Sequence, residues 1–309
     1  MQRVLILGCT GMLGSMVAEV FLRDASMDVV LACRNPQKWR SSCPRIVVVD
    51  EFDAELDSAG ERLDELLRCR RPAFIVNCIG IIKPYCRDGD IVGRSRAVFL
   101  NGLFPYRLQS AAGRHGARIV QIATDCVYDG AAGGYTEKSQ HNALDVYGKT
   151  KSLGEVPAAN FLNIRCSVVG PEKHNRLSLL EWFLGHPDGS VVSGYAHHRW
   201  NGVTSLQFAE LCRDIVLGES GLAFDALRCS GAVLHYVPNE TVTKYDLCNL
   251  FAQVYGRSVI VRRVTDEGMP IDRSLGAMDR VLLCGRSTMS MKVALQQLRE
   301  YTAECNFYG

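Results

Sequence analysis

The chain opens on Val4-Leu5-Ile6-Leu7-Gly8-Cys9-Thr10-Gly11-Met12-Leu13-Gly14, a short apolar run that leads into three glycines spaced G-x-x-G-x-x-G. The run predicts a buried strand, and the periodic apolar side chains of residues 12–23 predict a helix directly after it. In such a turn the first glycine permits a tight bend, the second lets the backbone approach a ligand, and the third lets helix and strand pack closely. The N–H groups at the helix N-terminus suit a pyrophosphate. The stretch therefore predicts a dinucleotide-binding turn with cofactor contacts at Gly8, Thr10, Gly11, Met12, Leu13 and Gly14.

Strand and helix patterns go on alternating through the first half of the 309 residues. Further strands are predicted at 29–33, 46–49, 74–77, 119–123 and 161–165, and helices at 61–67, 98–114 and from 146 onward. Later on, the pattern predicts helices at 177–184, 206–217 and 243–255, a loop at 225–231 and a returning strand at 233–237. Apolar strands alternating with amphipathic helices indicate an α/β fold of the Rossmann type, a doubly wound parallel sheet. We expect a cofactor-binding Rossmann domain over 1–169 and a smaller, interleaved α+β substrate lobe over 170–309, with some elements returning to the sheet.

The composition narrows the class of protein. The formal net charge is +2, with neither a basic block nor an acidic tail, so we expect no nucleic-acid partner. The N-terminal apolar run is too short for a signal peptide, and no apolar stretch is long enough to span a bilayer. Thirteen cysteines without a C-x-x-C pair predict buried thiols rather than a metal site. Free thiols belong to a reducing compartment, so the expected location is the cytoplasm.

The end of the second predicted strand bears on which nicotinamide cofactor the chain uses. NAD-binding folds place an acidic residue there to accept from the ribose hydroxyls. This chain has Arg34 instead, which pairs with a 2′-phosphate and so favours NADP(H). After the third strand, Asp53 is preferred over Asp50 as the acceptor from the adenine amino group. After the fourth strand, Cys78, Ile79 and Gly80 are expected along the ribose and nicotinamide.

A candidate catalytic pair stands on the helix predicted from residue 146. Tyr147 and Lys151 have the spacing Y-x-x-x-K, which puts both on one helix face. A nearby ammonium and the oxidised nicotinamide ring are expected to lower the pKa of the phenol, so that Tyr147 protonates a carbonyl oxygen as hydride reaches its carbon. Lys151 is also expected to hold the nicotinamide ribose. Thr124, at the end of the fifth strand, is placed to hydrogen-bond the substrate carbonyl. Asn101 either supports the site or is a solvated helix residue, and the sequence favours neither.

At these residues the chain resembles the dTDP-4-dehydrorhamnose reductase (RmlD-like) branch of the extended short-chain dehydrogenases. The resemblance rests on residues 8–14, 76–78, 124–130, 146–151, 154–155 and 163–165, and more thinly on 236–237 and 244–247. It implies NADPH-dependent reduction of the 4-keto group of a nucleotide-linked 6-deoxyhexose, with Thr124, Tyr147 and Lys151 in the catalytic roles.

The chain departs from that branch at residues 79–84 and 199–203, where the sugar nucleotide is expected to bind. The resemblance therefore implies the type of reaction more firmly than it implies the substrate. Lys83 and Arg199 are candidates for the diphosphate, because cationic donors suit it. Asn101, Thr124 and Asn175 are further substrate candidates. Trp182 and Trp200 are more readily interpreted as packing residues than as stacking platforms. No acidic set matches the magnesium of some family members.

Two rival functions stay open at this stage. A sugar-nucleotide epimerase of the same fold would hold NAD tightly, and Arg34 argues against it. A non-catalytic regulatory subunit, like that of methionine adenosyltransferase, also resembles this branch. The intact Thr124, Tyr147 and Lys151 favour an enzyme. The sequence is silent on oligomeric state, and a homodimer is left open.

Overall fold

A seven-stranded parallel sheet forms the centre of the computed structural model, which describes residues 1–39, 41, 43, 47–57, 59–265, 268–278, 280–283 and 287–308. The strand order is β11-β6-β5-β4-β1-β2-β3, and every pairing is parallel. The strands are β1 (Gln2–Leu7), β2 (Met27–Cys33), β3 (Val48–Glu51), β4 (Phe74–Asn77), β5 (Arg118–Ala123), β6 (Phe161–Arg165) and β11 (Val233–His235). The chain reverses its direction of progress between β1 and β4, which in such sheets opens a ligand-binding crevice at the carboxyl ends of the strands. The predicted doubly wound Rossmann fold is confirmed.

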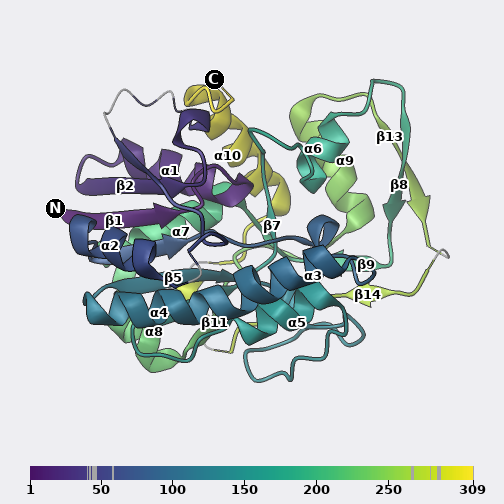
Figure 1. Ribbon diagram of the computed structural model, residues 1–309. Coiled ribbons are helices and arrows are strands. Elements are labelled where there is room, and N and C mark those ends of the chain that lie inside the picture. Colours follow the sequence, from purple (N-terminus) through teal and green to yellow (C-terminus); the bar gives the residue numbers. More distant parts are fainter. Residues whose placement is uncertain are drawn as a thin grey trace.

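Helices cover both faces of this sheet (Figure 1). Alternate residues of each strand point to opposite faces, so Val4 and Ile6 join one core while Leu5 and Leu7 join the other. The first core includes residues of α1 (Met12–Arg23), α7 (Ser205–Leu217) and α10 (Met291–Glu304). The second includes residues of α2 (Glu61–Arg70) and α4 (Phe104–Arg114), and α5 (Val146–Leu153) contributes Val146 and Tyr147 at its margin.

Three local expectations were wrong. The third strand lies two residues later than predicted; it is an edge strand, where Asp50 pairs with Arg70 at 2.6 Å, so its polar residues need no burial. Ile46, within the predicted strand, lies outside the described residues. The single helix predicted at 98–114 is a π-helical segment η3 (Val98–Leu103) followed by α4, and α3 (Ile91–Ala97), which was not predicted, precedes them. The loop predicted at 225–231 contains α8 (Phe224–Ser230), which buries Phe224 and Leu227.

The remaining elements form a lobe beside the sheet (Figure 1). Its strands are β7 (Val168–Val169), β8 (Val191–Tyr195), β9 (His198–Trp200), β10 (Val203–Thr204), β12 (Val242–Thr243), β13 (Ile260–Val264) and β14 (Ile271–Asp272). They form a β8–β13 pair, a β7–β10 pair and the sheet β12-β9-β14. Helices α6 (Leu179–Leu184) and α9 (Lys244–Tyr255) belong to the same lobe. Helix α7 and strand β11 lie against or within the main sheet. A domain boundary at 169/170 stays a prediction.

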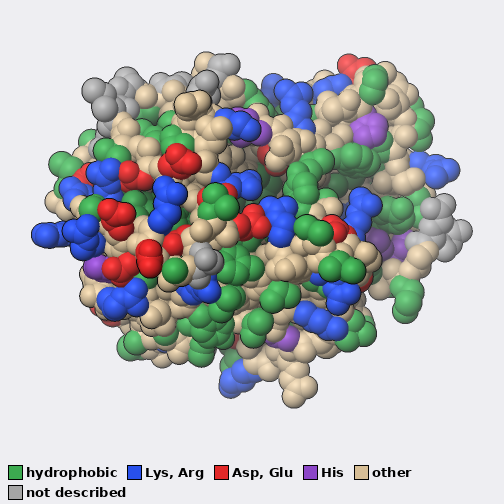
Figure 2. All heavy atoms as spheres, viewed as in Figure 1, with side chains coloured by type: hydrophobic (Ala, Val, Ile, Leu, Met, Phe, Trp, Pro, Cys, Tyr) green, Lys and Arg blue, Asp and Glu red, His purple; other side chains and the backbone are tan. Residues whose placement is uncertain are grey.

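The described residues show neither a helix long and apolar enough to cross a membrane nor a cluster of metal-ligating side chains. No disulfide joins any of the cysteines that the structure describes. On the face in Figure 2, basic and acidic side chains are interspersed over the part of the molecule that carries α2 and β1. This part of the surface therefore presents no broad field of one sign.

Candidate functional site

The glycine turn between β1 and α1 is tightly packed. Gly8 has a φ of +77°, and a Cβ there would lie 3.1 Å from the carbonyl carbon of Cys78. A Cβ on Gly14 would collide with the backbone of Gly8. Gly11 is exposed, and the first turn of α1 has no side-chain cap. Thr10 and Met12 are half-buried and Leu13 is buried at this helix start. The turn thus leaves backbone N–H groups facing outward, as anion binding requires.

The loop after β4 lies against this glycine turn. The backbone N–H of Cys78 donates to the carbonyl of Leu7 at 3.0 Å, and Ile79 donates to the Asn77 side chain at 3.1 Å. Gly80 follows Ile79 and lies next to the Asn101 side chain: a Cβ added to Gly80 would lie 3.3 Å from the amide oxygen of Asn101. The two loops that the sequence predicted to contact the cofactor therefore lie together at the carboxyl ends of β1 and β4, where sheets of this kind bind their ligands.

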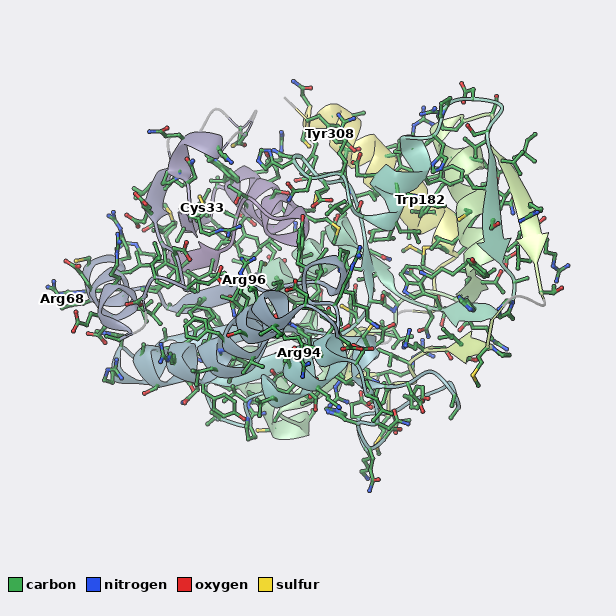
Figure 3. All side chains as sticks on the ribbon, turned by 45° about the vertical axis from the view of Figure 1, so that its right-hand side comes forward. Cys33, Arg68, Arg94, Arg96, Trp182 and Tyr308 are labelled. Carbon is green, nitrogen blue, oxygen red and sulfur yellow. The ribbon has the colours of Figure 1, made fainter. Side chains whose placement is uncertain are left out.

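Arg34 and Asp53 follow neighbouring strands on the other side of the glycine turn. Arg34 is exposed at the end of β2. Asp53 is half-buried after β3 and accepts the N–H of Glu55 at 2.9 Å. Arg96 binds the Glu55 carboxylate through two hydrogen bonds of 2.7 and 2.8 Å, and together with Arg34 it lowers the pKa of that carboxyl. No sequence pattern predicted this pair, because Arg96 lies in α3, a helix that was not predicted (Figure 3).

Asn101 is buried at 3% exposure, which decides between its two interpretations. Its amide oxygen accepts the N–H of Ile81 at 2.9 Å, and its nitrogen donates to the Ile81 carbonyl at 3.0 Å and to the Thr150 hydroxyl at 3.3 Å. The side chain thus ties the loop after β4 to helix α5. This placement suits a positioning role better than the substrate contact that was also considered for Asn101.

The structure brings the three candidate catalytic residues together. The phenol of Tyr147, on α5, lies close enough to the hydroxyl of Thr124, after β5, for Thr124 to lower the pKa of the phenol. Thr124 also donates to Asp125 at 3.1 Å and accepts the N–H of Cys126 at 3.1 Å. The Lys151 ammonium, one turn along α5, donates to the carbonyl of Ile122 on β5 at 2.8 Å. Helix α5 is held in place at its start, where Asp145 accepts the N–H of Gly148 at 2.8 Å.

Burial governs the proton affinities of these groups. It raises the pKa of the Tyr147 phenol well above its ordinary value, and Cys126 and Asp125 add to the effect while Thr124 opposes it. Burial also lowers the pKa of Lys151 to about 8, against the attraction of Glu155. The Lys151 ammonium is engaged by Ile122, and the expectation that it lowers the phenol pKa together with the oxidised nicotinamide ring stays a prediction.

The substrate candidates are scattered. The Lys83 ammonium lies 5.8 Å from the centroid of the Tyr147 ring and forms an ion pair with Asp145 at 3.0 Å. Arg199 on β9 has 60% of its side chain exposed and lies 3.4 Å from Asp272. Asn175 is exposed between β7 and α6. Of these three, only Lys83 is placed beside the catalytic residues by a described contact.

The two tryptophans considered for the substrate differ in their exposure to solvent. Trp200 is buried at 4% exposure, whereas Trp182 on α6 is 42% exposed and contacts His186. Figure 3 shows Trp182 in the lobe, away from Cys33 and Arg96 on the cofactor side. Packing accounts for the ring of Trp200, as expected.

Two cations near the site were missed. Arg273 donates to the carbonyls of Tyr128 and Asp129 at 3.0 and 3.2 Å, and it lies within electrostatic range of Cys126. Lys244, the first residue of α9, is half-buried and lies 5.1 Å above the Trp200 ring. A signal existed for Lys244, since a cation in the first turn opposes the helix dipole and such a position needs a reason. Arg273 carries no comparable pattern.

Comparisons with known proteins place the chain among reductases and related proteins that share this fold. A family model described as the RmlD substrate binding domain matches residues 1–178. Methionine adenosyltransferase 2 subunit beta from Bos taurus is 30% identical over 276 residues, which are 86% of this chain and 76% of that protein. A dTDP-4-keto-6-deoxy-D-glucose reductase from Streptomyces niveus is 28% identical over 163 residues, 52% of this chain and 49% of that protein.

The fold is shared with solved structures at lower identity. The crystal structure of a dTDP-4-dehydrorhamnose reductase from Bacillus anthracis, in complex with NADP, aligns with a TM-score of 0.72 at 17% identity and covers 97% of this chain and 99% of that one. The family match spans the glycine turn, Thr124, Tyr147 and Lys151. The chain therefore belongs to the RmlD-like family of extended short-chain dehydrogenases.

Proposed function

We propose that this protein is an NADPH-dependent reductase of a nucleotide-activated keto-sugar, acting on the 4-keto group of a 6-deoxyhexose. The observation that carries the proposal is the placement of Tyr147 close to Thr124, one helical turn from the buried Lys151 and at the carboxyl ends of the strands. A proton donor, a hydroxyl and an ammonium at one point suit the reduction of a carbonyl. The family and the reductase relative support the same reaction class.

The residues present fit a dinucleotide. The uncapped start of α1 and the exposed Gly11 suit its pyrophosphate, and Cys78 to Gly80 line the crevice where the ribose and nicotinamide would lie. The exposed Arg34 suits a 2′-phosphate, and Asp53 an adenine amino group. The Bacillus anthracis reductase, which has the same fold, was crystallised with NADP. Bound NADPH would supply the hydride.

The chain's own groups would handle the proton. A phenol whose pKa is raised by burial stays protonated at neutral pH and is a proton donor toward a carbonyl oxygen that is gaining charge. Thr124 lies close to the phenol, where the substrate carbonyl is expected. Lys151 presents an ammonium below about pH 8, suited to the ribose hydroxyls. Asn101 bonds to both the loop after β4 and helix α5, and so it would keep the cofactor-binding loop close to the proton donor on that helix.

The test is NADPH oxidation by the purified chain against a panel of dTDP-, UDP- and GDP-linked 4-keto-6-deoxy sugars. We expect one sugar to be turned over with NADPH and far more slowly with NADH. The same panel with the Tyr147→Phe variant controls for contaminating reductases. A chain that binds NADPH and oxidises it with no member of the panel would contradict the proposed reaction.

A regulatory subunit is the second candidate, because the relative matched over most of the chain is named as a subunit of methionine adenosyltransferase. Co-expression with a catalytic methionine adenosyltransferase subunit, followed by size-exclusion chromatography, tests it. A stable complex together with no NADPH oxidation would favour this function. An epimerase would instead copurify with NAD that never exchanges, and Arg34 argues against that. The cytoplasmic location and a possible homodimer remain predictions.

A further inference from the structure

Lys244 is a half-buried cation in an unfavourable place. It is the first residue of α9, where the partial positive charge of the helix end repels an ammonium. Burial lowers the pKa of its ammonium, while Asp125 opposes that effect from a distance. Within the described part of the chain, no ion pair and no hydrogen bond from this ammonium to a protein group is found. Buried charges in proteins are normally paired, so this one calls for a partner of opposite charge.

The surroundings of Lys244 point to the same missing partner. Its ammonium lies 5.1 Å from the centre of the Trp200 ring, and the buried indole N–H of Trp200 has no hydrogen-bond acceptor among the described residues. Arg273 is close enough to lower the pKa of Lys244 by repulsion. Two unsatisfied donors and a second cation therefore lie in one neighbourhood, within electrostatic range of Asp125 and Cys126 next to the catalytic Thr124.

The other cations considered for the substrate are already neutralised. Lys83 pairs with Asp145 at 3.0 Å, and Arg199 lies 3.4 Å from Asp272. Each would have to give up a carboxylate in order to receive a ligand. Lys244 forms no ion pair with a carboxylate among the described residues, and its ammonium lies over the Trp200 ring. An anion bound there would gain a charge-assisted hydrogen bond at a site that excludes much of the water.

We propose that Lys244, with the Trp200 N–H and Arg273, forms the subsite that receives an oxyanion of the substrate. This inference rests on the proposed function for the nature of the ligand, a nucleotide-linked sugar. Its oxyanion is either the diphosphate or a carboxylate on the sugar itself. The subsite assigns recognition to the lobe, at the start of α9, rather than to Arg199 on β9.

Binding measured without turnover tests the subsite. The full chain, saturated with NADP⁺, is titrated in a calorimeter with UDP, UDP-glucose and UDP-glucuronate, and in parallel with dTDP. We expect at least one to bind, and Lys244→Met to weaken that binding by about 10- to 100-fold, the worth of a hydrogen bond to a charged group. Weaker binding of UDP and UDP-glucose identifies the diphosphate as the oxyanion. A loss confined to UDP-glucuronate identifies the carboxylate.

Two controls make the result decisive. Lys138→Met removes an exposed lysine and should leave every affinity unchanged. Trp200→Phe keeps the ring and removes the N–H, so it should weaken binding less than Lys244→Met does. Unchanged affinities in Lys244→Met, or a parent chain that binds none of the four compounds, would overturn the subsite. A chain that binds them through Lys244 and yet reduces no keto-sugar would contradict the proposed reaction and leave the subsite standing.

Discussion

The carboxyl edge of the main sheet and the start of α9 in the lobe differ in whether their polar side chains have hydrogen-bond partners within the protein. At the sheet edge two of the three catalytic candidates have a protein partner: Thr124 donates to Asp125, and Lys151 donates to the Ile122 carbonyl. In the lobe, Lys244 and the Trp200 N–H have no partner among the described residues. Groups that carry out a reaction gain from being held before the substrate arrives, whereas groups that recognise a ligand can be left for the ligand to satisfy.

The largest expected effect removes the proton donor at the sheet edge. Tyr147→Phe deletes one hydroxyl and keeps the ring that packs at the margin of the second core, so the fold and NADPH affinity should persist. Turnover on the best keto-sugar should fall by about 10²- to 10⁴-fold, the usual worth of a general acid. Steady-state rates and a cofactor titration measure the two quantities separately. Turnover close to that of the parent chain would show that another group donates the proton.

The next effect concerns what holds the two regions together. Lys173, in the segment between β7 and α6, forms an ion pair of 3.0 Å with Glu19 of α1, whose side chain is fully buried. Lys173→Met leaves that carboxylate without its cation and should lower the free energy of unfolding by about 3–5 kcal/mol. Urea denaturation provides the measurement.

The matched control for Lys173 is an exposed ion pair. Arg118 and Asp225 are 2.7 Å apart, and 74% of the Asp225 side chain is exposed. Asp225→Asn should cost about 1 kcal/mol or less, since solvent screens such pairs. Equal losses from the two substitutions would mean that the buried pair does not hold the lobe to α1.

The same contrast explains what sequence reasoning found and what it missed. The ends of parallel strands meet at one edge, so residues placed directly after predicted strands, such as Thr124 and Cys78, could be assigned to one crevice. The lobe is built from strands of two to five residues without a strong period, so nothing in its pattern placed Arg273 at the site, and the charge at the start of a helix was the one signal for Lys244. Glu19 and Lys173 pair across 154 positions, a separation that no local rule reaches.

A smaller expected effect, on NADPH affinity, tests whether the cofactor binds at the sheet edge. Arg34 is exposed and lies within electrostatic range of Glu55, which Arg96 already binds. Arg34→Ala should therefore weaken NADPH binding by about 1.5–3 kcal/mol, the scale of a charge-assisted hydrogen bond, and leave NADH binding nearly unchanged. Fluorescence titration with both cofactors measures this difference. Equal affinities of the parent chain for NADPH and NADH would refute the role of Arg34.

The smallest expected effect is a dependence on pH that separates the two buried lysines. Burial lowers the pKa of Lys151 to about 8 from its ordinary 10.5, so its ammonium is lost as the pH rises through about 8. Cofactor affinity should then fall by about tenfold per pH unit at most, since one proton is involved. Stability should move the other way: between about pH 8 and 10.5 the unfolded chain holds a proton that the folded chain lacks, so the free energy of unfolding rises with pH.

Lys151→Met should abolish the fall in NADPH affinity above pH 8, whereas Lys244→Met should leave it in place, because Lys244 belongs to the lobe, at the start of α9, and is not among the residues expected to contact the cofactor. Titrations with NADPH from pH 6.5 to 9.5 on the parent chain and both variants make the comparison, at pH values chosen around the Lys151 pKa of about 8. A fall in affinity that survives in Lys151→Met would assign the titration to another group and remove Lys151 from the cofactor site.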